Sequence, residues 1–441
     1  MKRLRGVLFV TAILLVFTAC TAQPAEQVTG SAESSAPAQT AAPEPTATPE
    51  PTPEPTPEPR VLSFSPNTEI SKSKALSIVV KDVSYTQNQS IDLTLSMTNN
   101  DSDNWSFDTF NGSVNGWGFV YLLQEGYLSI DPGTSREVKL SAPLSPALDA
   151  MLNITDLQTV TLSVTGFPAL GGSMQDFPCD PLINAACAAD YTQTYPAIDS
   201  PLYDSKTMQI GLLNIDWENR LVYLFVDGLV SKNILLTSLY PAVNGYCLEE
   251  ANFSGYIPGD HGKTILVLDL SAITEQYSID SLKKLALSGA WTTKAGYLGY
   301  GFGDYITFPI PVEGGDDLYT PEYDETGDVW IDNDVVKLIY RGSAQTQYGD
   351  DGIAFLLINK TENKPLIIDY QQSLKFGEDR PYIYSNTLVA PGSAGIVTLS
   401  LYSMTGQPIF PEDVPITGSL TINSSGFSTV ATAKVDQQPK G

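Results

Sequence analysis

The sequence predicts an all-β protein built from three tandem antiparallel β-sandwich modules, and its strand pattern and internal repeat are the grounds for this. Residues 90–100 (SIDLTLSMTNN) alternate apolar and polar side chains and end in an Asn-rich turn, which is typical of a half-buried strand. The stretches 220–231 and 352–363 have the same form. The segment 278–287 (SIDSLKKLAL) is the single candidate for an amphipathic helix.

An internal repeat sets the number of modules. Each copy has a bend, a Pro-Gly turn that enters a strand, and a final strand, always in this order. A copy spans roughly 100–130 residues with about seven short strands, which favours an antiparallel sandwich over a parallel sheet with helical crossovers. The bends are SVNGWG (113–118), AVNGYC (242–247) and SLKFGE (373–378), and the turns begin at Pro132, Pro258 and Pro391.

Composition changes along the chain predict its organisation. A signal peptide comes first and is followed by a disordered linker rich in proline, glutamate and threonine. The three modules follow, and an acidic stretch separates the second from the third. The predicted ranges are 1–19 for the signal peptide, 20–60 for the linker, 61–198, 199–312 and 329–435 for the modules, 313–328 for the acidic linker and 436–441 for a polar tail.

The first twenty residues are typical of a secretory signal. Three basic residues precede an apolar run that is too short for a stable transmembrane helix, and the small residues Thr18 and Ala19 lead to Cys20. A cysteine at this place resembles the signal of bacterial lipoproteins. The resemblance implies that the Cys20 sulfur carries a lipid and anchors the protein on the extracellular face of the bacterial cell membrane. The alternative is an ordinary signal peptide followed by a chance cysteine.

Proline and glutamate dominate the stretch that leads to the first module. The sequence PEPTATPEPTPEPTPEP (43–59) favours a polyproline II helix, which extends by about 3.1 Å per residue, so we expect a solvated spacer here. The whole chain has a formal net charge of −26 at pH 7. Because this charge repels nucleic acid and anionic head groups, no nucleic-acid partner is expected.

The signal, the spacer and the turn-rich modules together resemble one class of protein. Gram-positive surface lipoproteins with Ig-like, telokin-like repeat domains of unknown function have this combination, and the resemblance covers residues 69–435. It implies an Ig-like sandwich for each module and an extracellular location. It transfers no catalytic residue.

The sequence NFSGYIPGDHGKTI (252–265) ends like a phosphate-binding loop but is predicted to be a turn. Such a loop needs a glycine where Ile257 stands, and a helix should follow Gly262-Lys263-Thr264 where a strand is predicted. No nucleotide is therefore expected. His261 is the only histidine of the chain, and no nucleophile motif accompanies it, so no Ser-His-Asp triad is predicted.

The cysteines beyond Cys20 leave one question open. Cys179 and Cys187 are close enough in sequence to close a disulfide loop, or both could stay reduced. Cys247 is expected to be a buried small hydrophobic residue. No spacing of cysteines and histidine indicates zinc.

Two further clusters have both a functional and a structural interpretation. Carboxylates in the acidic linker could bind Ca²⁺ through oxygen ligands, or could simply make a charged linker. Aromatic residues in 291–305 alternate with glycines and could stack on sugar rings, or pack across strands. The candidate metal ligands are Asp316, Asp317, Asp324 and Asp328, and the candidate sugar-stacking residues are Trp291, Tyr297, Tyr300 and Phe302.

The leading functional hypothesis is a lipid-anchored, non-enzymatic surface protein that binds or spaces something at the cell envelope. Its expected partners are the membrane, through the lipid, and a wall glycan, host glycan or protein ligand. No cofactor is expected besides the Ca²⁺ considered above. One alternative is a wall-associated enzyme with carboxylate catalysis, and another is a purely structural stalk.

Overall fold

The computed structural model describes residues 58–439 with several gaps. The fold belongs to the compact unit that extends over residues 61–441. The predicted signal peptide, Cys20 and nearly all of the predicted linker lie outside the described residues. No helix in the described part of the chain is long and apolar enough to cross a membrane. The gaps are 169–173, 178, 249–250, 252, 294–303, 317, 346–350, 369–372, 385–386, 403–408, 410 and 425–427.

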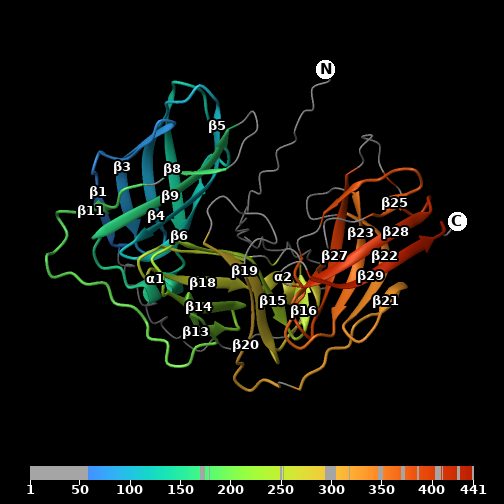
Figure 1. The fold of residues 1–441 in the computed structure, drawn as a ribbon. Helices are drawn as coiled ribbons and strands as arrows, with labels where there is room; N and C mark the ends of the chain where they lie inside the picture. The colour runs from blue at the N-terminus through green and yellow to red at the C-terminus, as the bar shows by residue number, and fades with distance from the viewer. Residues whose placement is uncertain are drawn as a thin grey trace, which may run out of the picture. The chain divides into compact units, whose positions relative to one another are not determined.

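The fold is all-β with several sheets, as the sequence predicts (Figure 1). Its first set of strands is called segment 1 and extends over 61–183. Its elements are β1 (Val61–Phe64), β2 (Thr68–Lys72), β3 (Leu76–Thr86), β4 (Ser90–Asn99), β5 (Trp105–Val114), β6 (Trp117–Leu123), β7 (Leu128–Ile130), β8 (Ser135–Pro143), α1 (Pro146–Leu152), β9 (Thr159–Pro168), β10 (Gln175–Phe177) and β11 (Leu182–Ile183).

Segment 2 extends over 203–310 and contains a similar series. Its elements are β12 (Tyr203–Asp204), β13 (Met208–Asp216), β14 (Leu221–Gly228), β15 (Ile234–Val243), β16 (Tyr246–Leu248), β17 (Phe253–Ile257), β18 (Lys263–Asp269), α2 (Ser271–Gln276), β19 (Leu285–Thr292) and β20 (Asp304–Ile310).

Segment 3 extends over 328–437 and completes the described strands. Its elements are β21 (Asp328–Asp332), β22 (Val336–Gln345), β23 (Asp351–Asn359), β24 (Leu366–Ile368), β25 (Lys375–Phe376), β26 (Tyr382–Tyr384), β27 (Ala394–Tyr402), β28 (Ile416–Ser424) and β29 (Ser428–Gln437).

The three segments share one order of hydrogen-bonded strands. Segment 1 has β1-β3-β4-β8, segment 2 has β12-β13-β14-β18, and segment 3 has β21-β22-β23-β27. Each segment also has a second group of hydrogen-bonded strands. Its central strand is β9 in segment 1, β19 in segment 2 and β28 in segment 3. The alternating burial along β4, which lies between β3 and β8, confirms the half-buried strand predicted at 90–100.

The Pro-Gly turns occupy equivalent places in this order. Each pair lies in a turn directly before β8, β18 or β27, and these strands pair antiparallel with β4, β14 and β23. The bond that closes each turn is also the same, because the last residue of the partner strand donates its N–H to the residue that precedes the new strand. The three bonds are Asn99 N to Thr134 O, Gly228 N to Gly262 O and Asn359 N to Ser393 O.

The helix considered at 278–287 is not present. The helix α2 ends before Ser278, whose positive φ of 50° leaves the helical region. The strand β19 begins at Leu285, and the Leu285 and Leu287 side chains are buried in the core. The apolar residues of this stretch therefore serve a strand, and the interpretation as a helix was wrong.

The hydrophobic cores continue from one segment into the next. The core of segment 1 includes Tyr223, Phe225 and Ile265 from segment 2. The core of segment 3 includes Ala242 and Cys247 from segment 2. The two boundaries between the segments are therefore packed apolar interfaces.

Candidate functional site

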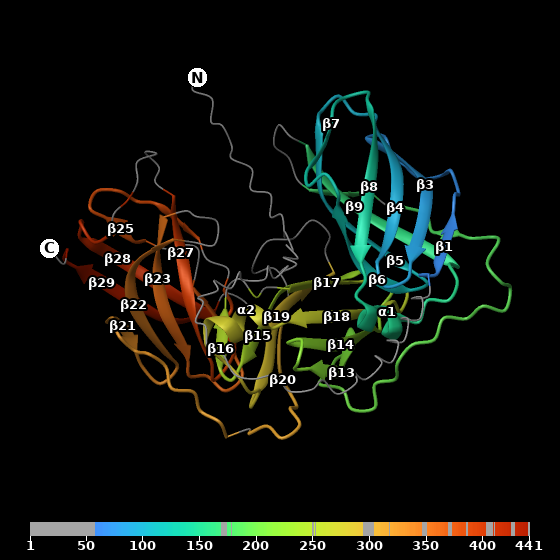
Figure 2. The ribbon, with the colours of Figure 1, turned by 180° about the vertical axis from the view of Figure 1, so that it is seen from behind.

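Segments 1 and 2 are connected by a parallel strand contact, here called joint 1. The strands β6 and β18 meet where Trp117 pairs with Lys263, and both labels lie close together in Figures 1 and 2. The Lys263 N–H donates to the Gly116 carbonyl at 2.9 Å. The buried Thr264 hydroxyl donates to the Gly118 carbonyl at 2.9 Å. The Gly-Lys-Thr sequence thus serves the joint, in agreement with the prediction that it is a turn entering a strand.

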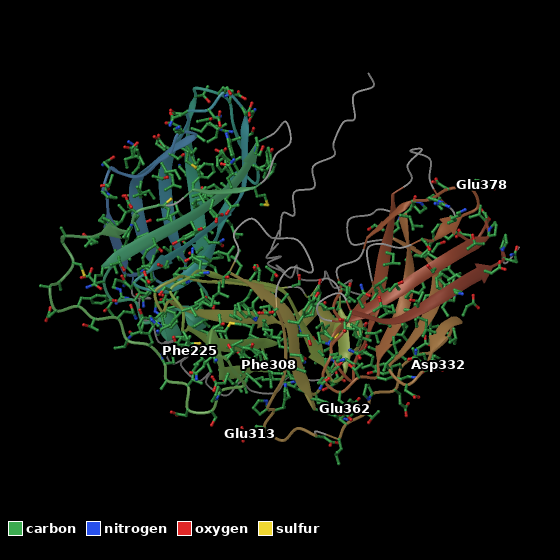
Figure 3. All side chains as sticks on the ribbon, viewed as in Figure 1. Phe225, Phe308, Glu313, Asp332, Glu362 and Glu378 are labelled. Atoms are coloured by element: carbon green, nitrogen blue, oxygen red, sulfur yellow. The ribbon has the colours of Figure 1, made fainter. Side chains whose placement is uncertain are left out.

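Trp117 fills the centre of joint 1. Its side chain is fully buried, and its Nε1–H donates to the Leu152 carbonyl at 3.0 Å. Its ring lies 5.0 Å from the ring of Tyr195 and 5.8 Å from that of Phe225 (Figure 3 labels Phe225). Next to it, a Cβ on Gly118 would lie 2.1 Å from the Tyr256 carbonyl oxygen, so only glycine permits this approach.

Tyr195 lies in the chain that connects segments 1 and 2, and its side chain contacts joint 1. Its hydroxyl donates to the Asn115 carbonyl at 2.5 Å. The Lys263 ammonium lies 4.9 Å from the centre of the Tyr195 ring and 2.9 Å from the Asp227 carboxylate. These contacts attach the connecting chain, the Asn-Gly bend and the incoming strand to one another.

Segments 2 and 3 are connected in the same way at joint 2. The strands β16 and β27 are parallel, with Tyr246 opposite Ala394, and the Ala394 N–H donates to the Gly245 carbonyl at 2.8 Å. In both joints, therefore, the glycine carbonyl of an Asn-Gly bend accepts from the first residue of the strand that follows the next Pro-Gly turn. Residues 117 and 246, the first after each bend, are both aromatic.

A tyrosine from the connecting chain closes joint 2 as well. The Tyr323 hydroxyl donates to the Gly245 carbonyl at 3.1 Å, and burial raises the pKa of this hydroxyl. The Tyr246 ring lies 5.4 Å from that of Tyr323 and 4.4 Å from that of Tyr277. The Tyr246 hydroxyl donates to the Glu322 carbonyl at 2.7 Å.

The two connecting chains share a short motif. Residues 191–195 read Tyr-Thr-Gln-Thr-Tyr and residues 319–323 read Tyr-Thr-Pro-Glu-Tyr, so both have the form Tyr-Thr-x-x-Tyr. The last tyrosine of each binds the preceding Asn-Gly bend. Sequence reasoning missed this motif, although its recurrence at the two boundaries was visible in the sequence.

The asparagines of the two bends hold the bend to the loop before the final strand. The Asn115 side chain accepts from the Gln158 and Thr159 N–H groups and donates to the Asp156 carbonyl. The Asn244 side chain accepts from the Lys283 and Lys284 N–H groups and donates to the Ser281 carbonyl. Both asparagines are buried and have positive φ, of 50° and 49°. Asparagine suits this role because it tolerates the left-handed region and bonds the backbone.

The acidic linker at 313–328 is attached to both of its neighbours. The Asp316 N–H donates to the Lys283 carbonyl at 2.9 Å, and the Lys283 ammonium lies 4.4 Å from the Tyr319 ring. On the other side, the Arg341 guanidinium bonds Asp324. Segment 2 therefore contacts the linker through the Lys283 carbonyl and ammonium, and a basic side chain of segment 3 lies against a carboxylate that has no basic neighbour in its own stretch.

The structure does not bring the predicted metal ligands together. The Asp316 carboxylate accepts from the Leu318 N–H, and the Asp328 carboxylate accepts from the Gln437 side chain. Hydrogen bonds from Thr326, and then Arg341, lower the pKa of Asp324. Asp317 lies outside the described residues. No group of three or more histidine, cysteine or carboxylate side chains in the described ranges is arranged to hold a metal ion.

The candidate disulfide is not formed in the structure. Cys179 and Cys187 are free thiols with different neighbours, because Cys179 contacts the Phe177 carbonyl and Cys187 the Ala188 carbonyl. Burial raises the pKa of Cys179 to about 12. Cys247 is fully buried at joint 2, as expected of a small hydrophobic residue, and burial raises its pKa to about 12.

Of the four candidate sugar-stacking residues, only Trp291 lies among the described residues. Trp291 lies half-buried in β19, and its Nε1–H has no hydrogen-bond partner within the described ranges. Tyr297, Tyr300 and Phe302 lie outside the described residues. His261 occupies the Pro-Gly turn with a positive φ of 63°, and its carbonyl accepts from the Lys263 ammonium.

Comparison with known proteins identifies no relative. No protein-family model and no curated protein matches the chain. Among solved structures, a Ca²⁺-stabilized adhesin of an Antarctic bacterium that binds ice is 10% identical over 82% of this chain and 80% of its own, with a TM-score of 0.14. A likeness at this TM-score supports no inference about this chain.

Proposed function

We propose that this protein is a lipid-anchored, non-enzymatic protein of the extracellular cell envelope that presents three tandem Ig-like β-sandwich modules in a fixed arrangement. The observation that carries the proposal is the repeated joint, because two boundaries use the same bend, the same backbone bond and the same Tyr-Thr-x-x-Tyr motif. A chain that only needed to separate two ends would not require specific joints. The arrangement supports a role in holding binding surfaces at a set distance and orientation.

The remaining parts of the proposal rest on the N-terminal sequence. A signal that ends in Cys20 and a proline-rich spacer would attach the modules to the membrane and lift them away from it. Interfaces within a chain that are large and apolar oppose domain motion. The apolar packing at both joints therefore favours a stiff presenter rather than freely hinged modules.

The variant Cys20→Ser tests the anchoring. The serine oxygen cannot take the place of the thiol in lipid attachment, so we expect loss of labelling by a palmitate analogue, together with either release of the protein into the medium or its retention with the signal uncleaved. A conservative Cys187→Ser variant, which changes a partly exposed thiol in the folded region, should fractionate like the unaltered protein. Continued labelling and membrane retention of Cys20→Ser would refute the proposal that this cysteine is the anchor.

A further inference from the structure

A small cavity is lined mainly by residues of segment 3 and also by Gly327 of the acidic linker. It has a volume of about 190 Å³. Ligand pockets for drug-sized molecules occupy roughly 300–1,000 Å³, so this one has room for only part of a ligand, such as one unit of a longer chain. Its apolar part comes from Tyr340, Val414 and Ile416, and its polar part from Arg341, Glu412 and Gln438.

Arg341 is positioned by an irregularity in β22. The pairing with β23 shifts between Tyr340 and Gly342, so Arg341 is the extra residue of a β-bulge. Bulges redirect a side chain and are frequent next to binding sites. Gly342 has a φ of 101°, and a Cβ built on it would meet no atom within 4 Å, so the bulge leaves open space beside the arginine.

The guanidinium of Arg341 is only partly satisfied. Its two terminal nitrogens bond Asp324 and Thr326. Its Nε is buried and has no hydrogen-bond partner among the described residues. A buried donor without an acceptor is unfavourable. Nη2 donates to the Asp324 carbonyl, and among the described residues its second hydrogen is left for a ligand oxygen.

The cavity lining also offers acceptors. One Glu412 oxygen accepts from the Ser343 hydroxyl, and Gln438 is bonded to Asp436 through its Nε2. A ligand that fits must therefore accept a hydrogen bond from Arg341 and donate one to the Glu412 carboxylate. It must also place an apolar face against Tyr340 and Val414. Sugar rings combine hydroxyl groups, which both donate and accept, with apolar C–H faces.

We propose that this cavity binds one residue of a neutral polysaccharide, with ring hydroxyls bonded to Arg341 and Glu412. The carboxylates of Glu412, Asp324 and Asp328 around it, and the net charge of −26, disfavour an anionic sugar. The inference rests on the proposed role as an extracellular binding protein and names the ligand class of that role. It assigns binding to residues other than the predicted aromatic cluster.

The test uses the complete chain, purified in a detergent without a sugar headgroup. Its probes are tetrasaccharides of β-1,4-linked glucose, β-1,4-linked N-acetylglucosamine and α-1,4-linked galacturonate, followed by calorimetry and tryptophan fluorescence. Trp330 reports on the site because its ring stacks 5.0 Å from that of Tyr340. We expect saturable millimolar binding of a neutral probe and none of galacturonate. The proposal is overturned if neither neutral probe binds, or if galacturonate binds as tightly.

Variants locate the binding. Arg341→Gln should weaken it about tenfold, the effect of one lost hydrogen bond. Because Arg341 also holds Asp324, the variants Glu412→Gln and Gln438→Ala provide changes that leave that contact in place. Arg136→Gln is the control, since Arg136 is an arginine paired with a carboxylate in segment 1. Unchanged binding in all three cavity variants, or equal weakening in the control, would overturn the assignment.

The outcome can be separated from that of the anchoring test. Binding to the purified chain does not require a lipid on Cys20. A protein that binds a neutral sugar but carries no lipid would support the cavity and contradict the anchor. A lipidated protein that binds neither neutral probe would support the anchor and contradict the sugar-binding cavity.

Discussion

Replacement of Trp117 by alanine is expected to lower the free energy of unfolding by about 3–5 kcal/mol, the usual cost of removing a buried large aromatic side chain. The ring is fully buried between Tyr195 and Phe225, and its N–H bonds the Leu152 carbonyl. Its loss would leave a cavity at joint 1 and remove one of the two donors to the Leu152 carbonyl, which also accepts from the Gln193 side chain. Urea unfolding followed by circular dichroism measures the change.

A second tryptophan supplies the control for this experiment. Trp217 is partly exposed in segment 2, where it contacts the Arg220 guanidinium and the Asp280 carbonyl. Trp217→Ala should lower the free energy of unfolding by only about 1 kcal/mol, because folding removes less apolar surface from water at this position. Equal losses in the two variants would contradict the importance assigned to Trp117.

Asn115→Ala and Asn244→Ala are each expected to lower the free energy of unfolding by roughly 2–4 kcal/mol. Asn244→Ala removes three side-chain hydrogen bonds and Asn115→Ala removes five, and each change leaves two N–H groups and a carbonyl with no side-chain partner. Since the two asparagines belong to different joints, the losses should add in the double variant. Chemical denaturation of the three variants measures both quantities.

Asn88 isolates the contribution of the backbone. It has a positive φ of 59° like the two bend asparagines, but its side chain is exposed. Asn88→Ala should therefore show only the strain of the left-handed region, at most about 1–2 kcal/mol. If Asn115→Ala and Asn244→Ala cost no more than this control, the side-chain bonds do not hold the bends.

Local pattern was sufficient to predict much of the fold. The alternation at 90–100 predicted β4, and the Pro-Gly pairs predicted turns that lead into β8, β18 and β27. These features depend on neighbours within a few residues, which a sequence displays directly. The helix considered at 278–287 failed because Leu285 and Leu287 fit either period, and the positive φ of Ser278 is not encoded by a glycine.

The joints could not be predicted because they depend on partners that are distant in the sequence. Asn115 was recognised as part of a bend, but its side chain bonds residues 41 to 44 positions away. The acidic linker was read as a charged linker because its own stretch contains no basic residue. Lys283 and Arg341, which contact this linker, come from segments 2 and 3. The Tyr-Thr-x-x-Tyr motif was detectable in principle, but its meaning required the hydroxyl contacts of Tyr195 and Tyr323.

Amide hydrogen exchange of three equivalent residues tests the repeated joint most directly. Lys263 and Ala394 donate their N–H groups across joints 1 and 2, whereas Ser135, the equivalent first residue of β8, follows no earlier segment. Amides whose bonds break only when a packed interface opens exchange slowly. We therefore expect strong protection of Lys263 and Ala394 and little protection of Ser135. Exchange of Lys263 and Ala394 as fast as that of Ser135 would contradict the claim that the segments are held in a fixed arrangement.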